Sequence, residues 1–187
     1  MLPFAAFLVL TGIEGWQPLA EMYPLVYTVK IAVVGGLWWY FRKRYPLPRA
    51  DGLLLGFIVG VAGVVVWIFL SELQLEKALL PEWLTPGRRT AFDPFTQFAS
   101  PAGRWAFIAV RIAGLAVVVP LMEEVFWRGF LLRWIIKEEF ETVPIGTFSR
   151  GSFALVTLTF MAVHPELLAA LVWGAAINGL LYRTRNL

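Results

Sequence analysis

Long apolar runs separated by short charged segments are the main pattern along this chain. The clearest run, from Leu53 to Ser71, has nineteen residues and no formal charge. Because a helix rises about 1.5 Å per residue, such a run covers the roughly 30 Å of hydrocarbon in a bilayer. A second run, from Pro24 to Phe41, contains Lys30, whose side chain must reach the interface or face the protein interior. We therefore expect two membrane helices in this half of the chain.

Three glycines repeat along one face of the first of these helices. Gly56, Gly60 and Gly63 follow the spacing of successive helical turns. Small residues in such a stripe allow another membrane helix to approach closely. The apolar segment from Met1 to Ile13 is too short to cross a bilayer alone.

The second half of the chain continues the pattern, with clear signals where helices are expected to begin. Asp93-Pro94 and Ser100-Pro101 each combine an N-cap residue with proline at the first helical position. From Trp105 the helical spacing continues to about Lys137, and Pro120 within it predicts a bend or a projection beyond the bilayer. Two further apolar stretches follow a polar connection: Ser152–Val163 and Leu167–Tyr182.

These segments predict an all-α fold, a polytopic transmembrane bundle with about five to six membrane helices in this chain. We expect a single membrane domain over residues 1–187. Within it, residues 1–72 form amino-terminal helices, residues 73–103 an extracytoplasmic or interfacial connection, and residues 104–187 the core. The positive-inside rule places the first basic connection in the cytoplasm, because it holds Arg42, Lys43, Arg44 and Arg49 and no acidic residue among them.

Composition supports a membrane location and excludes several kinds of chemistry. Of the 187 residues, 59% are hydrophobic and 16% are charged, against about 25% charged in a soluble domain. The absence of cysteine excludes disulfides, thiolate metal sites and cysteine nucleophiles. The net charge is +3, but the basic residues mostly flank apolar segments and act as topology signals. We expect the lipid bilayer as a partner and no nucleic acid.

Three charges interrupt the long apolar helix at Glu123, Glu124 and Arg128. Each charge at membrane depth costs roughly 2.5 to 3.5 kcal/mol on insertion scales. Glu124 and Arg128 are four residues apart, in the favoured order for an ion pair on a helix. Glu123 points in a different direction around the helix and has no such local partner.

The chain has a single histidine, His164, within apolar sequence. If the helices before and after the polar connection form an antiparallel hairpin, Glu123 and His164 lie at equal depth, because the midpoint between them falls at Val143-Pro144. A carboxylate and an imidazole in a water-poor cavity can act as a general-base pair. The alternative is a structural histidine held by hydrogen bonds. A zinc ion usually takes three protein ligands, so one histidine and no cysteine leave a divalent metal possible but not firmly implied.

Together, the motifs Glu123-Glu124-x-x-x-Arg128-Gly129 and Phe160-x-x-x-His164 resemble the first two motifs of the CAAX-protease and bacteriocin-processing (CPBP, or Abi) intramembrane endopeptidases. The resemblance covers mainly residues 120–187. It implies that Glu123 and His164 activate water for peptide-bond hydrolysis, while Glu124 and Arg128 organise the site. It also implies a membrane-associated protein or peptide as the substrate, and leaves both metal-dependent and metal-free mechanisms open.

One motif of that family is missing from these residues. The family's third motif, His-x-x-x-Asn on a further membrane helix, supplies groups that stabilise the oxyanion. Asn178 does not take this role, because Gly174 stands where the histidine is required. One more family helix would be expected after Leu187, so we expect that the sequence as written is truncated, and its activity is uncertain because the third motif is missing.

The amino-terminal half resembles a particular bacterial branch of the family, the CAAX-protease-related proteins found with exosortase sorting systems. The resemblance rests on Glu14-Gly15-Trp16 and on the aromatic run near Trp38. It implies a multi-pass protein of the bacterial inner (plasma) membrane.

Two functions of other classes remain open from the sequence. A non-catalytic membrane scaffold or immunity-type binding protein would keep the same charges as a buried ion-pair network. A transporter is less well supported, because paired broken helices in two matching halves are not apparent.

Overall fold

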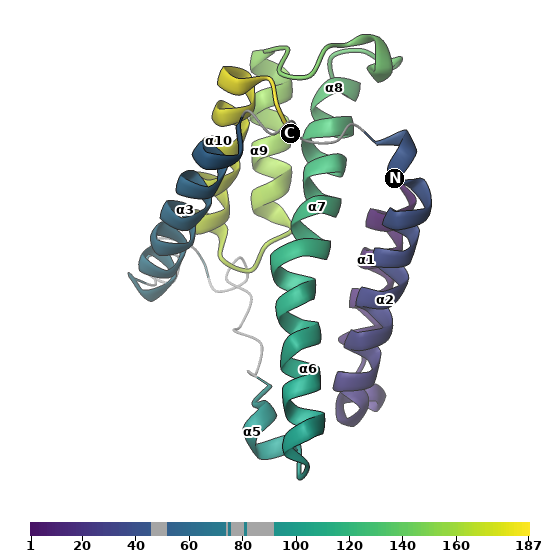
Figure 1. Cartoon of the computed structure of the whole chain (residues 1–187). Coiled ribbons are helices and arrows are strands. Elements are labelled where there is room, and N and C mark those ends of the chain that lie inside the picture. The colour runs from purple at the N-terminus through teal and green to yellow at the C-terminus, as the bar shows by residue number, and fades with distance from the viewer. Residues whose placement is uncertain (46–51, 74, 76–80, 82–91) are drawn as a thin grey trace. The chain divides into compact units, whose positions relative to one another are not determined.

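The computed structural model describes residues 1–45, 52–73, 75, 81 and 92–187, and within these residues every regular element is a helix (Figure 1). This confirms the predicted all-α fold. The α-helices are α1 Leu2–Glu14, α2 Tyr23–Phe41, α3 Leu53–Leu73, α5 Pro94–Gln97, α6 Pro101–Ala113, α7 Val119–Glu123, α8 Leu132–Trp134, α9 Arg150–Ala162 and α10 Leu167–Thr184. Short 3-10 segments cover Gln17–Met22, Arg42–Arg44 and Phe140–Thr142, and π-helical segments cover Gly114–Val118 and Glu124–Leu131.

Among the described residues, four helices are long and apolar enough to cross a membrane. These candidate spans are Tyr23–Arg44, Leu54–Leu73, Pro101–Trp134 and Leu167–Thr184. Two shorter apolar helices, Leu2–Glu14 and Arg150–Ala162, accompany them. The protein is therefore an integral membrane protein, with the helices expected from its apolar pattern.

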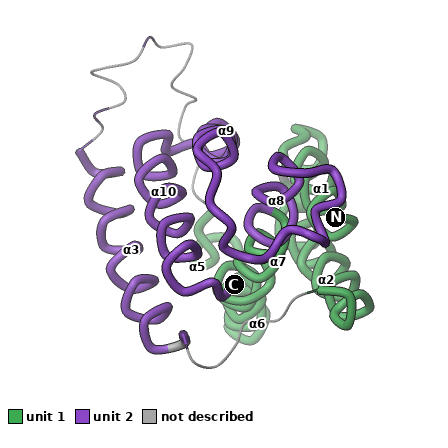
Figure 2. Tube along the Cα trace, turned by 90° about the horizontal axis from the view of Figure 1, so that it is seen from above, with its two compact units in different colours: residues 1–45, 90–126 green, residues 46–89, 127–187 purple. Residues whose placement is uncertain are grey.

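The helices form two compact units, shown in different colours in Figure 2. The first unit comprises Met1–Tyr45 and Thr90–Phe126, and the second comprises Pro46–Arg89 and Trp127–Leu187. The chain passes from one unit to the other inside the π-helical segment Glu124–Leu131. The interpretation of residues 1–187 as a single domain with three parts stays a prediction.

In the first unit, α2 packs between α1 and α6 through aromatic and branched side chains. Tyr27 and Ile31 on α2 and Phe107 on α6 form its buried core. Gly114, directly after α6, lets the two segments approach closely, because a Cβ atom there would lie 2.7 Å from the Tyr27 hydroxyl and 2.8 Å from Ile31 Cδ1.

We predict that Gly114→Ala destabilises the protein by about 1 to 3 kcal/mol, the usual cost of overpacking a core. The measurement is the free energy of unfolding of the purified full chain in detergent. Gly36→Ala on α2 is the matched control, because no described atom lies within 4 Å of a Cβ atom built there. A Gly114→Ala protein as stable as the Gly36→Ala protein would contradict the close packing.

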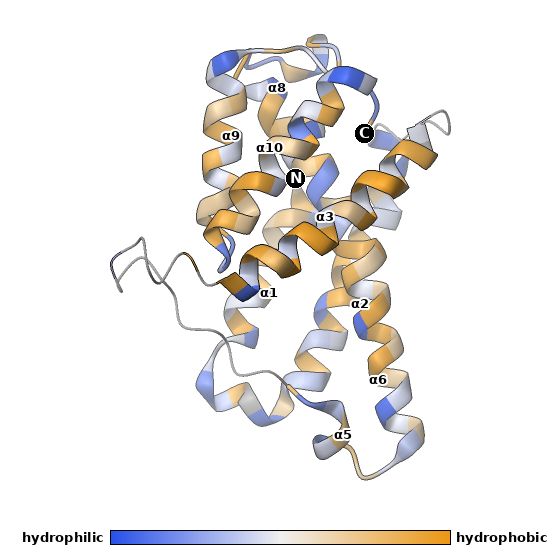
Figure 3. Ribbon diagram, turned by 90° about the vertical axis from the view of Figure 1, so that its left-hand side faces the viewer, coloured by the Kyte–Doolittle hydropathy of each residue, from blue (hydrophilic) through white to orange (hydrophobic). Residues whose placement is uncertain are grey.

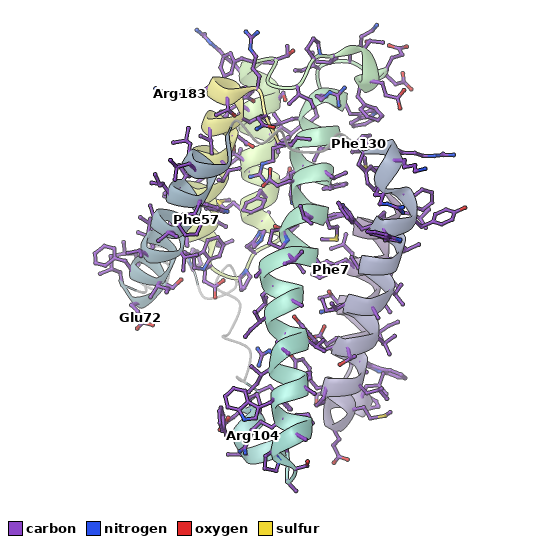
Figure 4. All side chains as sticks on the ribbon, in the orientation of Figure 1. Phe7, Phe57, Glu72, Arg104, Phe130 and Arg183 are labelled. Atoms are coloured by element: carbon purple, nitrogen blue, oxygen red, sulfur yellow. The ribbon has the colours of Figure 1, made fainter. Side chains whose placement is uncertain are left out.

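A buried ion pair joins α1 to α2 in the first unit. Lys30 is 4% exposed and pairs with Glu14, the last residue of α1. The Lys30 ammonium also lies 5.1 Å from the ring centre of Phe7, labelled in Figure 4, and 5.0 Å from that of Tyr27. Of the two predicted positions of the Lys30 side chain, at the membrane interface or facing the protein interior, the second is therefore confirmed.

In the second unit, α10 lies between α3 and α9 (Figure 2). A Cβ atom at Gly63 on α3 would overlap the Trp173 ring on α10, so this glycine is a close contact point. By contrast, no described atom lies within 4 Å of a Cβ atom built at Gly56 or Gly60. The predicted close approach along the glycine stripe is thus confirmed at Gly63 only.

Two helix starts agree with the local sequence signals. The Asp93 carboxylate accepts a hydrogen bond from the Phe95 N–H at 2.9 Å, and the Ser100 hydroxyl accepts one from the Gly103 N–H at 3.4 Å. Both residues precede a proline at the first helical position. The predicted N-caps are therefore confirmed.

The long helix around Pro120 is not a regular α-helix. Proline has no N–H, and its ring clashes with the carbonyl of the residue four before it in an α-helix. The preceding segment Gly114–Val118 is π-helical, with wider turns that relieve this clash. A second π-helical segment, Glu124–Leu131, carries the predicted charges, so the assumption of α-helical spacing between Glu124 and Arg128 was wrong.

The helix ends at Trp134, earlier than the Lys137 expected from the pattern. The cause is tertiary, because the following connection folds back onto the last turn. The Arg133 guanidinium donates to the carbonyl of Val143 at 2.6 Å and to that of Gly129 at 2.8 Å. These hydrogen bonds hold the connection at Val143 against the last turn of the helix.

Candidate functional site

The two predicted glutamates lie in the first unit, at a junction between helical forms. Glu123 is the last residue of α7, and Glu124 is the first residue of the π-helical segment. Both side chains are half-buried. Phe126 in the next turn stacks on Phe4 of α1, with ring centres 3.6 Å apart, so α1 packs directly against the segment that carries the glutamates.

Arg128 lies in the second unit and is 2% exposed. Its Nε donates to the side-chain oxygen of Asn178 on α10 at 3.0 Å. The Asn178 side-chain nitrogen in turn donates to the hydroxyl of Thr157 on α9, also at 3.0 Å. A buried chain of three polar side chains therefore connects the π-helical segment to both α9 and α10.

Phe160 on α9 is the aromatic centre of this region. The Arg128 guanidinium carbon lies 5.2 Å from the centre of its ring, within the range of a cation–π contact. The His164 ring lies 4.2 Å away at an interplanar angle of 32°, and the Trp127 ring meets Phe160 edge-on at 5.5 Å. The phenylalanine of the motif thus contacts both its histidine and the arginine of the other motif.

His164 lies in the turn between α9 and α10. Its Nδ1 is 2.7 Å from the backbone oxygen of Phe160. Because a carbonyl oxygen only accepts, Nδ1 carries the proton of the neutral ring and Nε2 carries the lone pair. Burial lowers the pKa of His164, opposed by the hydrogen bond to the Phe160 carbonyl. Burial therefore favours the neutral ring, with the proton on Nδ1 and the lone pair on Nε2.

Two of the four predicted site residues come together in one unit. Arg128 and His164 both contact Phe160 in the second unit, whereas Glu123 and Glu124 belong to the first unit. The pairing of Glu123 with His164 and that of Glu124 with Arg128 stay predictions. The role of Asn178 beside Arg128 was not predicted, although an amide in an apolar membrane helix indicates that a buried partner is needed.

The described residues do not provide a typical zinc site. Within this part of the chain, no three or more histidine or acidic side chains gather closely enough to hold a metal ion. A catalytic zinc usually takes three protein ligands, so the donor set does not fit this group.

Residues 105–187 match the family model described as Type II CAAX prenyl endopeptidase Rce1-like. The match covers both motifs and confirms the family resemblance that they predicted. No curated protein matches the chain. The solved structures likewise contain no match.

Proposed function

We propose, on the premise that residues 105–187 form a CAAX-protease-like segment of a membrane protein, that this protein is an intramembrane endopeptidase. The observation that carries the proposal is the arrangement around Phe160 within the matched segment, where a buried Arg128 and a half-buried His164 both contact the Phe160 ring. Glu123 and Glu124 belong to the same matched segment and supply the carboxylates that hydrolysis needs.

In the proposed reaction, Glu123 removes a proton from water while the oxygen of that water attacks the carbonyl carbon of the substrate. His164 accepts a hydrogen bond from the same water through Nε2, the nitrogen that carries the lone pair. Protonated Glu123 then gives its proton to the leaving amine nitrogen as the peptide bond breaks. Glu124 and Arg128 hold the geometry and balance the charge.

The proposed pairing of Glu123 with His164 rests on the sequence. The midpoint between the two residues falls at Val143-Pro144, in the connection of the expected antiparallel hairpin, so the hairpin would bring them to equal depth.

The proposed substrate is a membrane-associated protein or peptide, and the description of the matched family suggests a prenylated carboxy-terminal CAAX sequence as the first probe. The proposed location is the bacterial inner membrane, and the resemblance of the amino-terminal half to exosortase-associated proteins is what supports it.

We predict that the purified full chain in lipid vesicles cleaves a fluorogenic farnesylated CAAX peptide and that strong chelators leave the rate unchanged. The physical reason is the donor set, which lacks a group of three metal-binding side chains among the described residues. The measurement is the initial rate with and without chelator, together with the masses of the products. The same peptide without its farnesyl group is the matched substrate control.

Two results would contradict parts of this proposal. Activity that chelators abolish and zinc alone restores would replace the metal-free reaction by a metal-dependent one. If the protein expressed at full length from its native locus folds but cleaves neither peptide, that result would contradict the endopeptidase and favour the membrane scaffold or immunity-type binding protein.

A further inference from the structure

Asn178 lies outside both sequence motifs, yet it is the most enclosed polar residue of the region around Phe160. It is 0% exposed, and Thr157 and Arg128 beside it are 4% and 2% exposed. The orientation of its amide is determined by chemistry, because the Arg128 guanidinium has donors and no acceptor. The amide oxygen must therefore face Arg128, and the amide nitrogen faces the Thr157 hydroxyl, as the two 3.0 Å hydrogen bonds show.

We propose that Asn178, supported by Thr157, is a positioning residue for the endopeptidase site and acts by fixing the orientation of the Arg128 guanidinium against Phe160. This inference rests on the proposed function. It assigns Asn178 no contact with the substrate and no part in stabilising the oxyanion.

The attachment point on Arg128 explains how one hydrogen bond fixes an orientation. The guanidinium is planar, with its five N–H groups in a rigid fork. Asn178 binds Nε, the nitrogen nearest the side-chain stem. The hydrogen bond fixes the direction of the Nε–H bond, and the Phe160 ring, 5.2 Å from the guanidinium carbon, limits rotation of the planar group about that bond. The terminal nitrogens then keep defined directions.

The same face of α10 also supports Phe160. Gly174 lies four residues before Asn178, and positions four apart share a face of an α-helix. A Cβ atom at Gly174 would lie 3.1 Å from Phe160 Cδ1, so the α10 backbone packs closely on this ring. One helix face therefore holds both the arginine and the aromatic ring that it contacts.

A substitution at Thr157 distinguishes a positioning role of Asn178 from a role in packing alone. The Thr157 hydroxyl accepts a hydrogen bond from Asn178, and valine has nearly the same shape as threonine but no hydroxyl. Thr157→Val removes the acceptor of the amide nitrogen and loosens Asn178, while Asn178→Leu removes the contact with Arg128 itself. Ser152→Ala is the matched control, since Ser152 is 0% exposed on the same helix and its hydroxyl donates to the Leu132 carbonyl at 2.5 Å. The Ser152→Ala variant also loses a buried hydrogen bond, but that bond does not involve Arg128 or Asn178.

The experiment measures kcat, KM and the thermal unfolding midpoint of the full chain with the farnesylated CAAX peptide. We expect Asn178→Leu and Thr157→Val to lower kcat by roughly 10- to 100-fold, as the loss of hydrogen bonding around a buried charge implies, with KM unchanged. Thr157→Ser returns the hydroxyl and is expected to recover most of kcat. Ser152→Ala is expected to lower the unfolding midpoint and leave kcat unchanged.

Wild-type kcat in both Asn178→Leu and Thr157→Val would overturn the inference, and so would a loss of kcat that Ser152→Ala reproduces. If Asn178→Leu fails to fold, the kcat values of Thr157→Val and Thr157→Ser alone test the inference. A double-mutant cycle of Arg128→Met with Thr157→Val, measured by unfolding, tests the connection without any activity. Additive effects of the two substitutions on stability would overturn the inference. If the effects are coupled but the wild-type protein cleaves no peptide, the proposed function is overturned, and the positioning role with it.

Discussion

Glu123→Gln is expected to reduce cleavage of the farnesylated CAAX peptide by about 100- to 10,000-fold, the range that a positioned general base contributes. Glutamine has nearly the same shape but cannot take a proton from water. The measurement is the initial rate of the purified full chain at equal protein concentration. Glu138→Gln is the matched control, because Glu138 is exposed in the connection after α8 and its variant should cleave at the wild-type rate.

His164→Ala is expected to reduce cleavage by a similar factor, since it removes the nitrogen that orients the water. Both variants should reach the membrane at wild-type levels. Full processing by Glu123→Gln and His164→Ala would exclude the proposed reaction. Loss of folding without any change in a substrate's mass would instead support a structural network of charges.

Lys30→Met is expected to destabilise the protein by roughly 3 to 5 kcal/mol, because it leaves the buried carboxylate of Glu14 without its cation. The double variant Glu14→Gln, Lys30→Met should recover most of this loss, since it leaves no buried charge at this place. The measurement is the free energy of unfolding of the full chain in detergent.

Lys43→Met provides the control for this second prediction, because Lys43 is exposed after α2 and its loss should change the stability little. A Lys30→Met protein as stable as the Lys43→Met protein would show that the ion pair does not hold α1 to α2. A double variant less stable than the single one would show that the Glu14 carboxylate stabilises the protein through contacts other than the ion pair with Lys30.

The parts of the fold that depend on neighbouring residues could be predicted from the sequence. The starts at Asp93 and Ser100 were predictable because capping involves a side chain and an N–H only two or three residues away. The membrane spans were predictable because their apolar length is itself the physical requirement. The two motifs led to Arg128 and His164, whose shared contact with Phe160 the structure shows.

Features that depend on distant residues could not be predicted in the same way. The sequence showed that the Lys30 charge could not face lipid, but it did not identify the partner, because Glu14 is sixteen residues away on another helix. The two hydrogen-bond partners of Asn178, Arg128 and Thr157, are fifty and twenty-one residues away. The π-helical segment Glu124–Leu131 has no composition of its own that separates it from an α-helix, and its presence follows from packing.

The helix α3 has a consequence for how the protein moves in a bilayer. Figure 3 shows it apolar along its length, and none of the side chains in its membrane-spanning window is buried. Lipid tails solvate every side of such a helix equally well, so they give it no preferred rotation about its own axis. Its azimuth must therefore come from the protein, and the contact of Gly63 with Trp173 is the place where α3 meets α10 closely enough to set it.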